Sequence, residues 1–193
     1  MNVINNEIQL NLTEKLTFLM KFIKSPSQVG SITPSSRFLA KKILESIDWK
    51  TVRTMAELGA GTGVFTKHIE ALKHPDCRVA IFEKDEEMRD ELNTLYPDCI
   101  YFDDALHLAE DVQSVGMGSL DAIISGLPFM LFEETAREQI IDEVQHSLKP
   151  KGVFVAFQYS LQMKNLLSRI FSRVEIHFVP LNLPPAFVYV CHK

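Results

Sequence analysis

Several residue patterns that mark whole classes of protein are missing from this 193-residue chain. It has only three cysteines, Cys77, Cys99 and Cys191, whose odd number and wide spacing exclude a disulfide framework and a zinc ribbon. The six histidines show no metal-ligand spacing, so we expect no metal. The longest nearly uncharged apolar stretch, 120–132, contains an Asp and a Pro and is too short to cross a bilayer. Residues 1–7 lack the basic flank and apolar core of a secretory signal, so we expect a cytoplasmic protein without a transmembrane segment.

A strong basic excess, the usual footprint of a general nucleic-acid binder, is also missing. The chain carries 20 Lys and Arg against 25 Asp and Glu, a net charge of −5. The charges are unevenly spread, with a net +3 in residues 1–50, −13 in residues 51–144 and +5 in residues 145–193. The two basic ends can dock on an anionic surface if the fold brings them to one side.

Short apolar runs alternate with helical stretches from residue 51 onward. The expected strands are 52–58, 78–82, 99–102, 120–125, 152–157, 174–179 and 187–191. The expected helices between them are 63–72, 86–95, 105–112 and 133–148. This alternation predicts an α/β fold with a doubly wound, mostly parallel seven-stranded sheet. The last two strands are joined by a short proline-rich connection, so we expect them to pair as a C-terminal antiparallel hairpin.

Two helices are expected before this region. Residues 11–24 place Leu12, Leu16, Leu19 and Ile23 on one face, a pattern typical of an amphipathic helix. A second helix is expected at about 35–46. We therefore divide the chain into an N-terminal helical segment, 1–48, which forms a lid or contacts a membrane, and a domain over 49–193.

The sequence Glu57-Leu58-Gly59-Ala60-Gly61-Thr62-Gly63 ends the first expected strand, just before a helix. Glycines there let the chain turn tightly and let backbone amides approach a ligand over a helix N-terminus. Glu83 ends the second strand, where a carboxylate can accept hydrogen bonds from both ribose hydroxyls. Asp104 ends the third strand. Each acid alone is also explained as a cap of the helix that follows.

Together these features resemble the S-adenosylmethionine-dependent class I methyltransferases, which have a Rossmann-like fold, over residues 30–193. The resemblance implies that the glycines wrap the methionine part of the cofactor, that Glu83 holds the ribose and that Asp104 reaches the adenine amine. The residues expected to bind S-adenosyl-L-methionine are Glu57, Gly59, Ala60, Gly61, Gly63, Glu83, Lys84, Asp104, Ala105 and Ser125.

Ser125-Gly126-Leu127-Pro128-Phe129 follows the fourth expected strand, where this class places the methyl acceptor. It resembles the Asn-Leu-Pro-Tyr motif of the rRNA adenine dimethyltransferases, with Gly126 and Phe129 in place of Asn and Tyr. Phe129 can stack on a base, form a wall of a box for an ammonium group, or pack inside a buried turn. The residues expected at the reacting centre are Ser125, Gly126, Leu127, Phe129 and Tyr159.

Three stretches, 22–40, 125–128 and 182–189, resemble the bacterial phospholipid N-methyltransferases, which methylate phosphatidylethanolamine. The resemblance implies an enzyme that methylates a phospholipid amine while bound peripherally to an anionic membrane surface, and it favours lipid over RNA as the partner. Two alternatives stay open: an rRNA adenine N6-methyltransferase, and a non-catalytic cofactor-binding module on the same fold.

Overall fold

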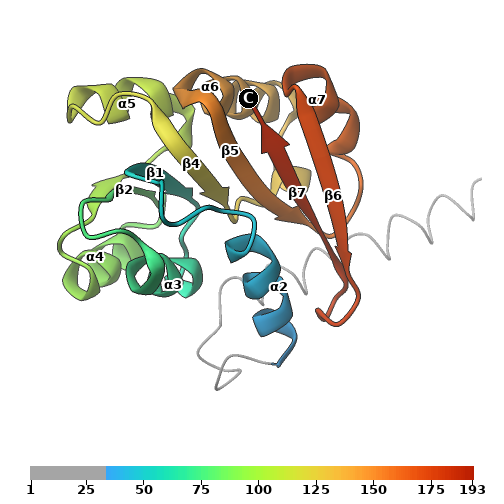
Figure 1. Ribbon diagram of the computed structural model, residues 1–193, viewed down its shortest axis with the longest axis horizontal. Coiled ribbons are helices and arrows are strands. Elements are labelled where there is room, and N and C mark those ends of the chain that lie inside the picture. Colours follow the sequence, from blue (N-terminus) through green and yellow to red (C-terminus); the bar gives the residue numbers. More distant parts are fainter. Residues whose placement is uncertain (1–33) are drawn as a thin grey trace, which may run out of the picture. The chain divides into compact units, whose positions relative to one another are not determined.

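The computed structural model describes residues 34–193 (Figure 1). The amphipathic helix expected over 11–24 lies outside the described residues. The part that the structure describes is one compact unit beginning at Pro34, whereas the sequence-based division lies between residues 48 and 49. The helix that begins at Pro34 therefore belongs to the same unit as the sheet.

A seven-stranded sheet forms the centre of this unit. Its strands are β1 Thr54–Leu58, β2 Arg78–Phe82, β3 Ile100–Phe102, β4 Leu120–Ser125, β5 Leu148–Gln158, β6 Arg173–Val179 and β7 Ala186–His192. They lie in the order β3-β2-β1-β4-β5-β7-β6. Neighbouring strands from β3 to β5 are parallel, and β7 is antiparallel to both β5 and β6. The predicted sheet with its antiparallel hairpin is confirmed.

Six helices cover the two faces of the sheet (Figure 1). They are α2 Pro34–Leu44, α3 Val64–Leu72, α4 Glu86–Leu95, α5 Leu108–Ser114, α6 Glu134–Ser147 and α7 Lys164–Ile170. Buried side chains of α2, α3 and α4 join one apolar cluster, and those of α5, α6 and α7 join another. Short 3-10 turns at Ala105–His107 and Phe129–Leu131 precede α5 and α6. The sheet is thus buried on both faces, which explains its nearly continuous apolar strands.

Two local features differ from the sequence-based expectation. No helix was expected between β5 and β6, but α7 lies there. This helix has only seven residues, of which Leu166 and Leu167 are buried, so its sequence shows no helical repeat of apolar residues. β5 begins at Leu148 instead of residue 152, because the polar stretch 149–151 continues the strand past a register irregularity opposite β4.

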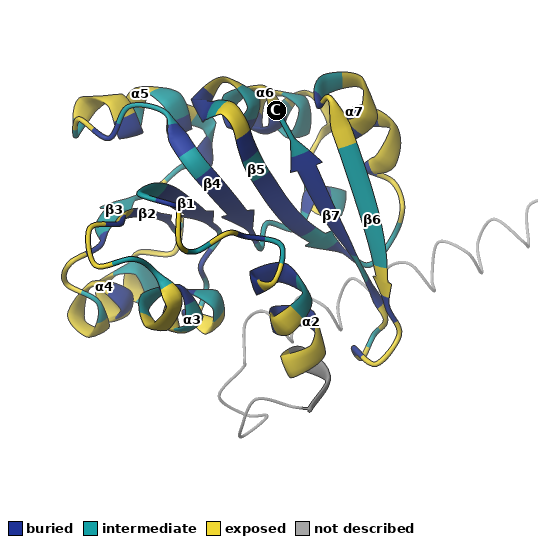
Figure 2. Ribbon diagram, viewed as in Figure 1, coloured by how far each residue is buried: buried dark blue, intermediate teal, exposed yellow. Residues whose placement is uncertain are grey.

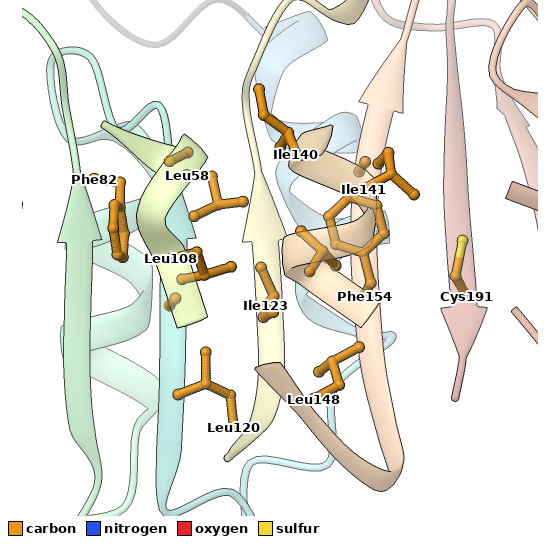
Figure 3. Packing of buried hydrophobic residues seen from close by; sticks show 14 of the residues in the cluster. Leu58, Phe82, Leu108, Leu120, Ile123, Ile140, Ile141, Leu148, Phe154 and Cys191 are labelled. Carbon is orange, nitrogen blue, oxygen red and sulfur yellow. The ribbon is translucent and has the colours of Figure 1, made fainter. Parts of the chain in front are cut away.

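The larger apolar cluster fills the space between the sheet and the layer of α5 and α6 (Figure 3). Ile123 of β4 and Phe154 of β5 lie at its centre, and both are completely buried. This packing fixes the strands relative to one another. It therefore also fixes the loops at their carboxyl ends.

The carboxyl ends of β1 to β5 lie at one edge of the sheet, called here the carboxyl edge. β6 also ends there, because β6 and β5 are both antiparallel to β7 and so run in the same direction (Figure 1). β2 and β3 lie on one side of β1, and β4 and β5 lie on its other side, so the strand order changes direction between β1 and β4. In open α/β sheets, ligands bind at the carboxyl edge beside such a switch point.

Candidate cofactor and acceptor site

The three glycines after β1 have left-handed backbone conformations, with φ of 72° at Gly59, 55° at Gly61 and 78° at Gly63. Their surroundings differ. A Cβ added at Gly59 would lie 2.8 Å from the side chain of Leu127, and one at Gly63 would lie 2.5 Å from that of Leu92. A Cβ added at Gly61 would meet no atom within 4 Å. The loop is therefore packed at both ends and open at its middle, as a cradle for a ligand requires.

Glu83, at the end of β2, joins this loop directly. One of its carboxylate oxygens accepts a hydrogen bond from the Gly61 amide at 2.7 Å, and the other accepts one from the Asp85 amide at 2.9 Å. Arg89 donates to the Glu83 carbonyl at 2.8 Å. A carboxylate has about four acceptor positions, so two N–H donors leave room for hydroxyl groups. This arrangement fits a ribose held beside the glycine loop.

Glu57 lies on β1 beneath the same loop and is completely buried. Its Oε2 accepts a hydrogen bond from the Thr66 hydroxyl at 2.7 Å, while its Oε1 is buried without a partner. Burial raises the pKa of Glu57 to about 7, against the lowering effect of the hydrogen bonds from Thr66. An unpartnered carboxylate oxygen here fits a ligand that brings positive charge, as S-adenosylmethionine does.

Asp104 caps the 3-10 turn after β3, because its Oδ1 accepts a hydrogen bond from the Leu106 amide at 3.0 Å. Its Oδ2 lies 3.5 Å from the ammonium of Lys84, and the Lys84 side chain is highly exposed. The next residue, Ala105, is buried. Asp85 caps α4 in the same way through the Met88 amide. Capping uses only one oxygen of Asp104, so its expected contact with adenine stays a prediction.

The segment after β4 is held against the glycine loop by its backbone. The Gly126 amide donates to the Leu58 carbonyl at 2.8 Å, and a Cβ added at Gly126 would lie 2.9 Å from the Gly59 carbonyl oxygen. Ser125 is buried, and its hydroxyl accepts a hydrogen bond from the Leu127 amide at 3.2 Å. The close approach explains the Gly at position 126: an Asn there would push its Cβ into the loop backbone.

Two buried side chains that were not among the expected site residues fix the chain after β4 and after β5. Gln158 is buried at the end of β5, and its side-chain amide donates to the Leu127 carbonyl at 3.0 Å. Tyr189 of β7 is also buried and donates to the Ser160 carbonyl at 2.9 Å. The only sequence signal for Gln158 is a polar residue after the apolar run 152–157.

The two aromatic candidates for contact with the acceptor lie in different surroundings. Phe129 is completely buried, because the 3-10 turn that it begins folds its ring into the core, edge-on to Phe132 with 5.9 Å between ring centroids. In this structure the ring has no exposed surface for an acceptor to touch. Tyr159 is half-buried, edge-on to Phe157. Burial raises the pKa of Tyr159, and a hydrogen bond with Asn182 acts in the opposite direction.

No three His, Cys, Asp or Glu side chains within residues 34–193 lie together in a way that could hold a metal ion. Within the same range, no helix is long and apolar enough to cross a membrane.

Comparisons with known proteins agree with this geometry. The family described as a methyltransferase domain matches residues 55–152, from β1 into β5. An ornithine lipid N-methyltransferase from Singulisphaera acidiphila is 34% identical over 179 residues, which cover 90% of this chain and 93% of that protein.

Two solved structures show the likeness of fold. N-methyltransferase NodS from Bradyrhizobium japonicum WM9, in complex with S-adenosyl-L-homocysteine, has a TM-score of 0.68 at 15% identity and covers 83% of this chain and 88% of its own. A 1,6-didemethyltoxoflavin-N1-methyltransferase from Burkholderia thailandensis has a TM-score of 0.67 at 14% identity, over 96% of this chain and 89% of its own. Because the family match and the curated relative extend this likeness to the sequence, the chain belongs to the class I S-adenosylmethionine-dependent methyltransferases, close to the lipid N-methyltransferases.

Proposed function

We propose that this enzyme transfers a methyl group from S-adenosylmethionine to the primary amine of a membrane lipid, with phosphatidylethanolamine as the first candidate. The observation that carries the proposal is the 34% identity to an ornithine lipid N-methyltransferase over 90% of the chain. Phosphatidylethanolamine and ornithine lipids both present an amine at the polar end of a molecule with acyl chains. Phosphatidylethanolamine is favoured by the resemblance of 22–40, 125–128 and 182–189 to the phospholipid enzymes.

The geometry supports N-methylation of an aliphatic amine over methylation of an RNA base. The rRNA adenine enzymes carry an Asn that accepts from a flat exocyclic amine, and position 126 has no space for that side chain. The second aromatic of that motif corresponds to Phe129, which is buried and offers no stacking surface. The chain also lacks the basic excess of an RNA-binding surface.

The bound cofactor supplies a methyl group on a positively charged sulfonium. The open loop around Gly61 and the carboxylates of Glu83 and Glu57 would hold the cofactor. For transfer, the neutral acceptor amine must lie about 3–3.5 Å from the methyl carbon and in line with the departing sulfur. The Tyr159 hydroxyl orients that amine, beside the segment after β4 that Gln158 holds in place through the Leu127 carbonyl. Because the pKa of Tyr159 is raised, its phenol stays protonated at neutral pH and forms hydrogen bonds without acting as a base.

The enzyme acts, in this proposal, from the cytoplasmic side as a peripheral protein on the inner face of the membrane. The three cysteines are free and buried, which is in keeping with a reducing compartment. The amphipathic pattern of residues 11–24 supports contact of that segment with anionic lipid.

Labelled S-adenosylmethionine tests the proposal directly. The purified chain is incubated with vesicles of phosphatidylethanolamine, with vesicles of an ornithine lipid, or with total RNA, and label is measured in each acceptor. We expect label in the phosphatidylethanolamine. Label in the ornithine lipid alone would move the substrate to that lipid, label in RNA alone would overturn the proposal, and cofactor binding without transfer to any acceptor would indicate a binding module.

A further inference from the structure

An apolar protrusion stands at the connection between β6 and β7. Phe178, Leu181 and Leu183 are 58%, 62% and 75% exposed, and the stretch from Phe178 to Cys191 contains no charged residue. We call residues 178–185 the hairpin tip. Figure 2 shows its exposed residues at the end of β6, next to the buried strand β7. Single exposed apolar side chains are common on protein surfaces, whereas several large ones grouped on one exposed turn indicate an interaction site.

The outward position of the two leucines is fixed by the residue between them. Asn182 is buried, its amide N–H donates to the Val179 carbonyl at 3.3 Å, and its side chain donates to the Pro184 carbonyl at 2.6 Å. With Asn182 held inside, Leu181 and Leu183 on either side of it point outward. Their exposure is therefore a property of the folded turn.

The hairpin tip also adjoins the acceptor site. It lies at the carboxyl edge, as do the glycine loop and the segment after β4, because β6 is parallel to β5. Its buried residue Asn182 lies close enough to Tyr159, which follows β5, to act against the raised pKa of that phenol. One side of the turn thus contacts the candidate acceptor site while the other side presents leucines to solvent.

The neighbouring helix supplies charge of one sign. α2 contacts β5, β6 and β7, and its charged residues Arg37, Lys41 and Lys42 are all basic. Lys42 is close enough to His177 of β6 to contribute, after burial, to the lowered pKa of that histidine. One acid, Glu45, follows the helix and lies 3.5 Å from Lys41. Exposed apolar residues beside basic residues match the composition of a surface that lies on an anionic bilayer.

From these observations we infer that the hairpin tip inserts Leu181 and Leu183 into the interfacial layer of an anionic lipid bilayer, beside the basic side chains of α2. This deepens the proposed function, on which it rests, since it places the acceptor site at the membrane surface where a lipid amine lies. The lipid head group then reaches the site past Asn182 and Tyr159, without leaving the bilayer.

Sedimentation of the full chain with vesicles tests the inference. The vesicles contain equal parts of phosphatidylcholine and phosphatidylglycerol, and the test variant is Leu181→Ser with Leu183→Ser. The matched control is Leu72→Ser with Leu95→Ser, which removes leucines that are 45% and 65% exposed at the opposite edge of the sheet, where α3 and α4 end. We expect the tip variant to lose at least fivefold in vesicle affinity and the control to bind as the wild type does. Equal binding by the tip variant and the wild type would overturn the inference.

A fluorescence measurement distinguishes insertion of the hairpin tip into lipid from coverage of the tip by protein. In Leu183→Trp we expect a blue shift on vesicle addition and quenching by brominated acyl chains, compared with the parent chain and its single Trp49. A blue-shifted emission before vesicles are added, unchanged by them, would mean that the tip is covered by residues 1–33 or by a second copy, and would contradict the inference.

The same variants distinguish this inference from the proposed function. If the wild type transfers no methyl group to any lipid, yet the tip variant loses vesicle binding, then the proposed function fails and the membrane contact stands. If the wild type methylates lipid and the tip variant both binds and methylates vesicles normally, then the membrane contact fails alone. With lipid dispersed in detergent micelles, we expect the tip variant to keep most of its activity.

Discussion

At the scale of single residues, the three glycines after β1 are required for different physical reasons. All three have φ values that favour glycine, between 55° and 78°. Gly59 and Gly63 in addition lie against the side chains of Leu127 and Leu92, so a substitution there disturbs packing. Only at Gly61 does an added side chain enter open space, and only there does a substitution probe the ligand.

We therefore expect Gly61→Ala to weaken S-adenosylmethionine binding by about tenfold or more, equivalent to about 1.4 kcal/mol. The new Cβ occupies the space over the loop, and the left-handed backbone adds strain of roughly 1–2 kcal/mol. Gly118→Ala is the matched control, because Gly118 has a φ of 64° and equally open surroundings but lies before β4, away from the carboxyl edge. Titration calorimetry measures both. Similar affinities in the two variants would place the cofactor elsewhere.

Glu57 makes a prediction about pH. Its pKa is about 7 in the folded chain, against an ordinary value of 4.5. Between these values the folded state keeps a proton that the unfolded state has released, so the stability that Glu57 contributes is fully present below pH 4.5 and is lost as the pH rises to about 7. The full shift corresponds to something on the order of 3 kcal/mol.

Urea unfolding of the cofactor-free chain at pH 5 and pH 7.5 measures this effect. The wild type should be less stable at pH 7.5 than at pH 5 by the amount that Glu57 contributes. We expect Glu57→Gln, which cannot ionise, to lack this difference. Glu87→Gln, at an exposed position of α4, should keep the pH dependence of the wild type. The same pH dependence in all three chains would show that Glu57 is ionised in the folded state.

At the scale of elements, the end of β5 organises the acceptor segment. The Gln158 side chain holds the Leu127 carbonyl, and replacing it with an apolar group leaves that carbonyl without this hydrogen bond. We expect Gln158→Met to cost about 0.5–1.5 kcal/mol in stability, because the Leu127 carbonyl keeps its hydrogen bond from the Phe129 amide. We also expect it to lower methyl transfer several-fold with little change in cofactor affinity. Gln113→Met, at an exposed position of α5, is the control. A parallel loss of cofactor binding would mean that Gln158 supports the glycine loop instead.

The elements themselves were largely predictable from the sequence, and their contacts were not. Strands such as β4 are buried on both faces and therefore appear as apolar runs, and the glycines mark the turn after β1. The inward fold of Phe129 and the reach of Gln158 to Leu127 depend on how loops from separate strands pack. No local pattern encodes that packing, so the same motif allowed Phe129 to be either a buried ring or an acceptor contact.

At the scale of the whole molecule, the fold separates charges that alternate along the chain. The exposed acids of α4, Glu86, Glu87, Asp90 and Glu91, lie on the helix that joins β2 to β3, at one end of the strand order. The basic helix α2 contacts β6 and β7, at the other end (Figure 1). A net charge of −5 therefore does not prevent one side of the enzyme from approaching an anionic surface.

This separation predicts how vesicle binding depends on salt and on individual lysines. We expect Lys41→Gln with Lys42→Gln to weaken binding to anionic vesicles by about 2 kcal/mol at low salt, because each lysine near the surface contributes about 1 kcal/mol. The difference from wild type should shrink as the salt concentration rises and the Debye length shortens. Lys50→Gln with Lys151→Gln removes the same charge from exposed positions at the opposite edge of the sheet and should have little effect. If both pairs weaken binding equally at every salt concentration, net charge governs the attraction and the orientation given by α2 is wrong.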